Sequence, residues 1–190
     1  KLGTTSAGIK TPGRADLVVM EIAAGSTVAG LFTQNDFCAA PVTLCKQHMA
    51  SASPVYLLTN TGNANAGTGE QGFNDALQSC QVLATAAGVD AEQVLPFSTG
   101  VIGEPLPMDR LLAGIPGALA NLSEQGWSDA ATGILTTDTR PKGASLQYAV
   151  GDGQVTITGI SKGSGMIKPN MATMLGYVAT DVARDSERLH

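Results

Sequence analysis

Two runs of alternating polar and apolar residues flank a short glycine-rich turn in the second half of this 190-residue chain. The runs are Ser145–Val150 and Gln154–Thr158, and Gly151–Gly153 joins them. Alternation at period two is typical of a β-strand, and a Gly-Asp-Gly segment between two such runs predicts an antiparallel hairpin. The fold must therefore include a sheet that contains this hairpin.

Further strands are expected elsewhere in the chain. Asp16–Ile22 and Thr27–Phe32 have the composition of two strands joined by a short turn, which predicts a second hairpin. Other apolar runs predict strands at Val55–Leu58, Val94–Phe97 and Met174–Val178. The first of these leads into a polar loop over Asn60–Gly69, and Pro96 favours an edge position for the second because proline donates no hydrogen bond.

The longest helix is predicted over Phe73–Ala87, where apolar residues recur at helical spacing on one face. Asn74 or Asp75 is the expected cap at its start, and Gly88 is expected to end it. Shorter helices are expected over Ala40–Ala50, Pro107–Leu112, Pro116–Leu122 and Ser128–Leu135. Hairpins combined with separate helices favour an α+β fold over a doubly wound parallel sheet.

Composition excludes several classes of protein. The length suits a single domain over residues 1–190, and 43% apolar residues with only 14% charged residues indicate a buried core. A net charge of −5 without a Lys/Arg cluster argues against nucleic-acid binding. No apolar run approaches the ~18 residues of a membrane span, and the first residues do not resemble a signal peptide.

Cysteine and histidine usage points to a cytoplasmic protein without a metal site. The three cysteines, Cys38, Cys45 and Cys80, have no C-x-x-C spacing and are expected to be reduced thiols. Only His48 and His190 could supply imidazole ligands, which argues against zinc.

The pair Ala172–Thr173 has a chemical consequence that most Ala-Thr pairs lack. A threonine hydroxyl inside a chain is a weak nucleophile because no adjacent group takes its proton. Cleavage before Thr173 would give it a free α-amine with a pKa near ~8, which can act as base for its own hydroxyl. Gly163, Gly165 and Pro169 precede the pair in a turn-rich stretch. The alternative is an ordinary threonine at the start of a strand.

The whole string around this pair is more specific than the pair itself. Lys162-Gly-Ser-Gly-Met-Ile-Lys-Pro-Asn-Met-Ala-Thr-Met-Leu175 resembles the self-cleavage segment of the ornithine acetyltransferases, also called bifunctional glutamate/ornithine N-acetyltransferases. Five further blocks resemble this family in the family's order: Leu31–Thr33, Ala40–Val42, Asn60–Asn65, Ser98–Gly103 and Thr136–Lys142. The resemblance therefore extends along nearly the whole chain.

The resemblance implies roles for individual residues. Thr173 would be the nucleophile, freed by cleavage after Ala172, and the Thr99 hydroxyl and Gly100 N–H would hold an oxyanion. Lys162 and Thr136 would bind substrate together with Thr173. Taken without the resemblance, Thr99-Gly100 is a turn, Lys162 is a solvated lysine, and Thr136 ends a helix.

Three other features are given structural interpretations. At least two of the three asparagines of Asn60–Asn65 are expected to form Asx turns, and the segment is expected to support the site structurally. Ser161 lies in a G-x-S-x-G string, but the following glycines and proline oppose the helix that a nucleophile elbow requires, so we reject it. Arg140 and Lys142 are expected to be surface charges, with Asp138 neutralised by Arg140.

The resemblance also implies a fold and a reaction. The fold would be a sheet-on-sheet core flanked by helices, similar to that of N-terminal-nucleophile hydrolases. The reaction would move acetyl from N2-acetylornithine to glutamate through an acetyl-threonine, with no metal or prosthetic group and with acetyl-CoA as a possible second donor. Family members continue for roughly as long again after the cleavage point, so a C-terminal β-chain half is the expected partner in a hetero-oligomer. The alternatives are a self-cleaving amide hydrolase or aminopeptidase, or an inactive structural half.

Overall fold

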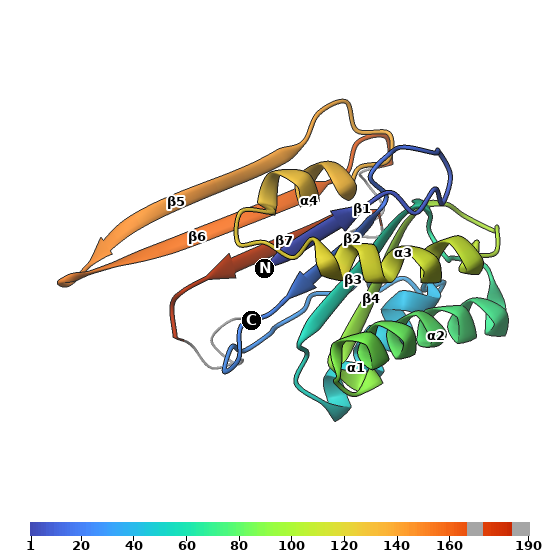
Figure 1. Cartoon of the computed structure of the whole chain (residues 1–190), viewed down its shortest axis with the longest axis horizontal. Coiled ribbons are helices and arrows are strands. Elements are labelled where there is room, and N and C mark those ends of the chain that lie inside the picture. Colours follow the sequence, from blue (N-terminus) through green and yellow to red (C-terminus); the bar gives the residue numbers. More distant parts are fainter. Residues whose placement is uncertain (167–172, 184–190) are drawn as a thin grey trace.

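A four-stranded and a three-stranded β-sheet pack against each other in the computed structural model, which describes residues 1–166 and 173–183. Helices cover the other face of the four-stranded sheet (Figure 1). The expected α+β fold, with one sheet stacked on another and flanking helices, is confirmed. It has the layering that the resemblance to N-terminal-nucleophile hydrolases implies.

The four-stranded sheet has the order β1-β2-β3-β4. Its strands are β1 (Leu2–Thr5), β2 (Leu17–Glu21), β3 (Tyr56–Asn63) and β4 (Val94–Val101). β2 pairs antiparallel with β1 and β3, whereas β3 and β4 are parallel. The hairpin expected between Asp16–Ile22 and Thr27–Phe32 is wrong, because both edges of β2 are already paired and the second segment is not a strand.

Successive side chains of these strands point to opposite faces of the sheet and so pack into two separate cores. Leu17 and Val19 of β2 face the helices, while Val18 and Met20 face the three-stranded sheet. On the first side lie α1 (Ala40–Ser51), α2 (Gly69–Ala87) and α3 (Met108–Ala120). On the second side, α4 (Trp127–Gly133) contributes Ala130 and Ala131 to the core between the sheets, and Ile134, which caps the end of α4, adds to it.

The three-stranded sheet contains the predicted hairpin. β5 (Lys142–Val150) and β6 (Gly153–Lys162) pair antiparallel, and β7 (Leu175–Thr180) joins the other edge of β6. Ile160 and Tyr177 face the four-stranded sheet, where the Tyr177 ring meets Phe97 edge-on at 5.3 Å between centroids. The distal part of the hairpin projects beyond the rest of the fold (Figure 1).

The helices differ most from the predictions at α2 and α3, whereas α1 and α4 differ from them by one or two residues at their ends. α2 begins at Gly69, so the predicted caps Asn74 and Asp75 lie inside it, although it ends at Gly88 as predicted, with φ +72°. The two helices predicted on either side of residue 115 are one helix, α3, with Pro116 inside it. Leu111, Ile115 and Ala118 are buried on one face of α3, and this packing outweighs the hydrogen bond that Pro116 removes.

Pro96 lies on an edge strand, as predicted, and α1 covers that edge. The Cys45 thiol donates to the Pro96 carbonyl at 3.1 Å, and His48 Nδ1 lies 2.7 Å from the Val94 carbonyl. These contacts satisfy carbonyls that an open sheet edge would leave free. Burial also raises the pKa of the Cys45 thiol to about 12, so it is a packing group rather than a nucleophile.

Candidate active site

A cavity of about 910 Å³ opens where β4, β6 and β7 meet. Five of the predicted site residues line it together, although they are spread over 75 positions of the sequence: Thr99, Gly100, Thr136, Lys162 and Thr173. The sixth, Ala172, lies outside the described residues, as do Pro169 and His190. The structure thus brings the described candidates into one space.

Thr99 and Gly100 lie near the carboxyl end of β4, where β3 and β4 come unusually close. Gly100 has φ +137°, and a Cβ atom there would lie 2.4 Å from the carbonyl carbon of Gly62. No larger residue fits this position without moving the β3 backbone. Because Gly100 has no side chain, β4 can lie this close to β3 at the cavity wall, next to the Thr99 hydroxyl.

Lys162 ends β6 and reaches across to the four-stranded sheet. Its ammonium donates to the Thr99 hydroxyl at 3.0 Å, and only 5% of the residue is exposed. Burial lowers the pKa of Lys162, Asp138 acts in the opposite direction, and Lys142 adds to the lowering. The expectation that Lys162 could be a solvated surface lysine is thus excluded.

A buried ammonium needs compensation that one hydroxyl does not supply. Removing an ammonium from water costs several kcal/mol, so buried cations are normally paired with anions. Among the described residues, the hydrogen-bond partner of Lys162 is Thr99, a neutral group. An anionic ligand in the cavity would complete the coordination of this cation.

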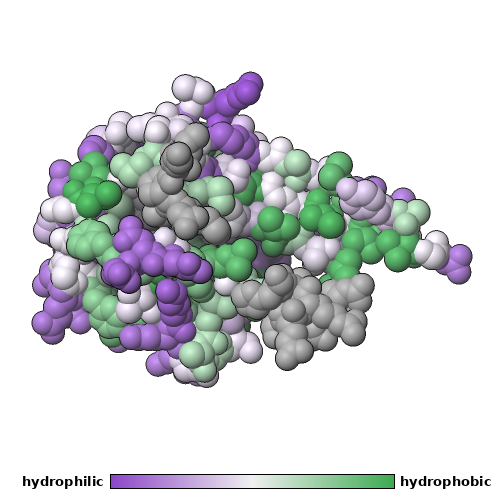
Figure 2. Space-filling view, turned by 180° about the vertical axis from the view of Figure 1, so that it is seen from behind, coloured by the Kyte–Doolittle hydropathy of each residue, from purple (hydrophilic) through white to green (hydrophobic). Residues whose placement is uncertain are grey.

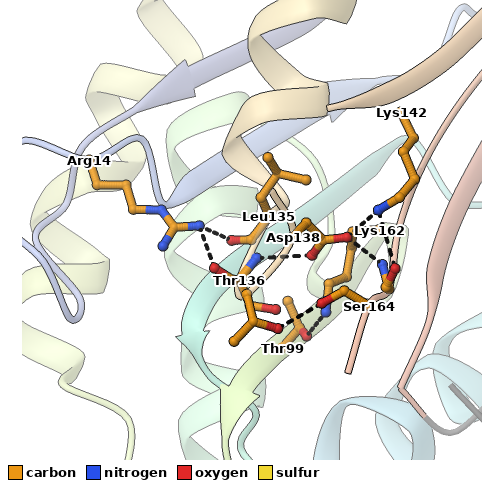
Figure 3. Close-up of polar contacts among 10 residues, drawn as sticks. Arg14, Thr99, Leu135, Thr136, Asp138, Lys142, Lys162 and Ser164 are labelled. Atoms are coloured by element: carbon orange, nitrogen blue, oxygen red, sulfur yellow. Dashed lines mark hydrogen bonds and ion pairs between the residues drawn. The ribbon is translucent and has the colours of Figure 1, made fainter. Parts of the chain in front are cut away.

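The segment Thr136–Lys142 runs beside the end of β6 (Figure 3). Asp138 has a fully buried side chain that forms an ion pair with Lys142. It also accepts the Gly163 N–H at 2.9 Å and the Thr136 N–H at 3.4 Å. Burial would raise the pKa of Asp138, but the hydrogen bonds from Lys142 and the two backbone groups outweigh it and lower that pKa to about 2.

The expected partner of Asp138 is therefore wrong. We predicted neutralisation by Arg140, but Lys142 forms the ion pair, while both cations lie at the surface as expected, with the Lys142 side chain 42% exposed. Lys142 opens β5, so the strand itself carries this ammonium back toward Asp138. Sequence distance alone could not separate the two cations.

Arg14 is a site residue that the sequence interpretation missed. It lines the cavity and donates to the Leu135 carbonyl at 2.6 Å and to the Thr136 carbonyl at 3.1 Å (Figure 3). The guanidinium thus fixes the backbone at Thr136 from the loop between β1 and β2. A turn signal at Pro12-Gly13 marks that loop, but no local pattern connects it with residues more than a hundred positions away.

Thr173 precedes β7 and is partly buried. Its hydroxyl donates to the Met166 carbonyl, so it already contacts the turn that follows Lys162. The Ala172–Thr173 bond itself includes a residue outside the described ranges.

Side-chain amides of Asn60–Asn65 connect the ends of β3 and β4 beside the cavity, and Asn63 forms one of the expected Asx turns. The Asn60 amide donates to the Asn63 carbonyl at 2.9 Å, and its oxygen accepts the Ser98 hydroxyl at 2.6 Å. Asn63 accepts the Asn65 N–H at 2.8 Å, which is an Asx turn. Asn60–Asn63 belong to β3 rather than to a loop, because this stretch pairs with the end of β4.

Ser161 is excluded as an elbow nucleophile, in agreement with the sequence argument. It lies within β6, and residues 163–166 after it are not helical. Within residues 1–166 and 173–183, no cluster of three or more His, Cys, Asp or Glu side chains could hold a metal ion. No helix in these ranges is long and apolar enough to cross a membrane.

Comparison with known proteins identifies close relatives along the whole chain. The model of the ArgJ family matches residues 1–190. The arginine biosynthesis bifunctional protein ArgJ of Pseudomonas fluorescens is 62% identical over 187 residues, which cover 97% of this chain and 46% of that protein. The protein of the same name from Colwellia psychrerythraea is 57% identical over 192 residues, covering 95% and 45%. The chain thus spans about half the length of these relatives.

Two solved structures share the fold. The ornithine acetyltransferase of Mycobacterium tuberculosis, solved in complex with ornithine, is 34% identical with a TM-score of 0.82, covering 94% of this chain and 91% of that one. The arginine biosynthesis bifunctional protein ArgJ of Bacillus halodurans is 33% identical with a TM-score of 0.75, covering 92% and 91%.

Proposed function

The chain belongs to the ArgJ family, and on that premise we propose that it is the N-terminal half of an acetyltransferase whose nucleophile is Thr173. The enzyme transfers acetyl from N2-acetylornithine to glutamate. Acetyl-CoA is a possible second donor, as the word "bifunctional" in the relatives' names allows. The precursor cleaves itself between Ala172 and Thr173, which frees the α-amine of Thr173.

The proposed reaction has two halves. The Thr173 oxygen attacks the acetyl carbonyl carbon while the α-amine of Thr173 takes the hydroxyl proton. The tetrahedral intermediate breaks its C–N bond, the departing ornithine amine receives that proton, and acetyl-threonine remains. The glutamate amine then attacks the ester carbonyl and loses a proton to the α-amine, which passes it to the Thr173 oxygen as the ester C–O bond breaks, so that the hydroxyl and the free α-amine are restored.

The observation that carries this proposal is the convergence of complementary groups on one cavity. Thr173 and Thr99 bring hydroxyls, Gly100 brings a backbone N–H, and Lys162 brings a buried ammonium. Acyl transfer needs a nucleophile, donors for an oxyanion, and groups that orient the substrate. The hydrogen-bond partner of the Lys162 ammonium is the neutral Thr99 hydroxyl, which favours a substrate carboxylate as its ionic partner, and both proposed substrates have one.

A partner for this chain is supported by the outer face of the three-stranded sheet. Side chains that point away from the four-stranded sheet are apolar and well exposed: Leu146, Tyr148, Val150, Ile157 and Val178. Figure 2 shows hydrophobic residues gathered along the projecting hairpin. Exposed apolar patches of this kind mark interaction sites. We propose that the C-terminal half of the same precursor covers this face in a hetero-oligomer.

The test uses the full-length precursor and two acceptors. Purified enzyme given N2-acetylornithine should form N-acetylglutamate when glutamate is present, and should release little free acetate when it is absent. Acetate release at the same rate with and without glutamate would instead identify an amide hydrolase. Absence of both products would leave only the structural-half alternative.

A further inference from the structure

Gly163 is held from both sides by one ion pair. Asp138 accepts its N–H at 2.9 Å, and Lys142 donates to its carbonyl at 3.2 Å. Asp138 and Lys142 are themselves paired, so the three groups form a closed ring of contacts. The N–H of Gly163 is thereby held by a carboxylate, and its carbonyl is held by an ammonium.

Gly163 lies at the point where the chain leaves the candidate site, so the ring of contacts acts on the backbone next to Lys162. Gly163 directly follows Lys162 and has φ +155°, a conformation that other residues rarely adopt. A second contact between the same segments joins the hydroxyls of Thr137 and Ser164 at 2.8 Å. The Thr136–Lys142 segment therefore anchors the chain where β6 ends and the turn toward Met166 begins.

We propose that Asp138 is a positioning residue: together with Lys142 it fixes Gly163, and thereby holds the Lys162 ammonium on the Thr99 hydroxyl. This inference rests on the proposed function for its effect on turnover. The physical reason is geometric. Lysine has four rotatable bonds, so the Lys162 ammonium reaches one point in the cavity reproducibly only if its backbone is fixed.

The ring also acts on the charge of Lys162. The negative charge of Asp138 favours the protonated ammonium, whereas the positive charge of Lys142 opposes it. Asp138 and Lys142 are the charged neighbours that influence this group; the other charged residues on the cavity wall are Lys10, Arg14 and Asp16. Removing either member of the pair should thus release Gly163, but the two removals should move the pKa of Lys162 in opposite directions.

The opposite pKa shifts expected for Lys162 allow an experiment on the full-length precursor. Asp138→Asn and Lys142→Met each break the ion pair with side chains of similar size. Arg140→Met is the matched control, because Arg140 is an exposed cation on the same segment. For each variant we would measure kcat and KM for acetyl transfer, and amide hydrogen exchange over the turn that begins at Gly163. The pKa of Lys162 would come from pH-dependent chemical labelling read by mass spectrometry.

Both ring variants should lower kcat/KM by up to about 100-fold, the loss that misplacement of a substrate-positioning group by about 1 Å can cause. Both should also speed hydrogen exchange at Gly163. The pKa of Lys162 should fall in Asp138→Asn and rise in Lys142→Met. Arg140→Met should stay within about twofold of the wild type in kcat/KM, as surface changes usually do.

Two outcomes would overturn the proposal. If Lys142→Met matched Arg140→Met in turnover and exchange while Asp138→Asn was impaired, Asp138 would act through charge alone. If neither variant changed exchange at Gly163, the ring would not fix the turn. The exchange and labelling measurements need no substrate, so they test the ring even if the wild type fails to transfer acetyl, a result that would count against the proposed function only.

Discussion

The Lys162 ammonium donates a hydrogen bond to the Thr99 hydroxyl at 3.0 Å, between the end of β6 and the end of β4. Because an ammonium only donates, the Thr99 oxygen is the acceptor, and its own O–H remains free to donate elsewhere. The same contact that anchors the cation therefore leaves the Thr99 proton available for an oxyanion. The proposed substrate-binding and oxyanion-binding groups are thus one connected unit.

Thr173 is expected to be essential for both cleavage and turnover. A full-length Thr173→Ala precursor has no hydroxyl to attack the preceding carbonyl, so it should remain a single chain and be inactive. Thr173→Ser keeps a hydroxyl and should still cleave. Intact-mass measurement of the purified proteins reads out cleavage, with a second fragment that begins at Thr173. Normal cleavage of the alanine variant would rule out the self-cleavage mechanism.

Thr99 is expected to affect the chemical step more than binding. Thr99→Ala removes one proposed oxyanion donor and should lower kcat by about 10²-fold or more, with a smaller change in KM. Thr99→Ser is the control, since it retains the hydroxyl. Steady-state kinetics with N2-acetylornithine would give both constants. An unchanged kcat in a folded Thr99→Ala variant would mean that Thr99-Gly100 serves only as a turn.

Lys162→Met should weaken binding of acetylornithine while preserving the fold, because it keeps the apolar stem and removes the charge. Calorimetry on the uncleavable Thr173→Ala background would measure the affinity. Arg140→Met is the control, because it removes an exposed cation that does not line the cavity. Equal affinity with and without Lys162 would contradict a role in substrate binding.

The pH dependence of activity should report the same lysine. In its proposed role, Lys162 holds a carboxylate only while it is protonated, which is the case below its pKa. Burial lowers that pKa from its ordinary value, so kcat/KM should fall as pH rises, and at a lower pH than an exposed lysine would give. A pH–rate profile of the wild type beside Lys162→Met would check this, since the variant should lack that alkaline limb.

Asp138 should contribute to stability in acid. Its pKa in the folded protein is about 2, below the ordinary value of 3.8, so the folded state favours its charged form. That contribution is present above pH 4 and is lost as the pH falls toward about 2. The free energy of unfolding of the wild-type precursor should therefore converge with that of Asp138→Asn over this interval. A difference that stayed constant from pH 5 to about 2 would contradict the assigned charge state.

Residues 1–190 alone are not expected to turn over substrate. The outer face of the three-stranded sheet exposes Tyr148, Val150 and Val178 by more than half, and such a surface favours aggregation when its partner is missing. Co-expression with the C-terminal half should restore solubility and acetyl transfer, both measurable on purified protein. Robust turnover by a monomeric 190-residue chain would show that the whole site lies within it.

Local patterns were sufficient for elements that depend on near neighbours. The β5–β6 hairpin follows from alternation on both sides of a glycine turn, and the body of α2 follows from the spacing of Leu77, Cys80 and Ala84. The same reasoning failed at Thr27–Phe32, which has the composition of a strand. Whether such a segment becomes a strand depends on a free sheet edge, and β1 and β3 already occupy both edges of β2.

For the site, the sequence by itself determined the chemical groups, and the tertiary structure decided which of them meet. Thr99, Thr136, Lys162 and Thr173 were identified from residue types and from the resemblance of the surrounding strings. Their convergence on one cavity was decided by the packing of one sheet on the other. The pairing of Asp138 with Lys142, and the reach of Arg14 to Thr136, also belong to the tertiary structure. The reason is physical. Residue type determines which chemical groups a side chain has, whereas chain segments far away in the sequence determine its contacts and its burial.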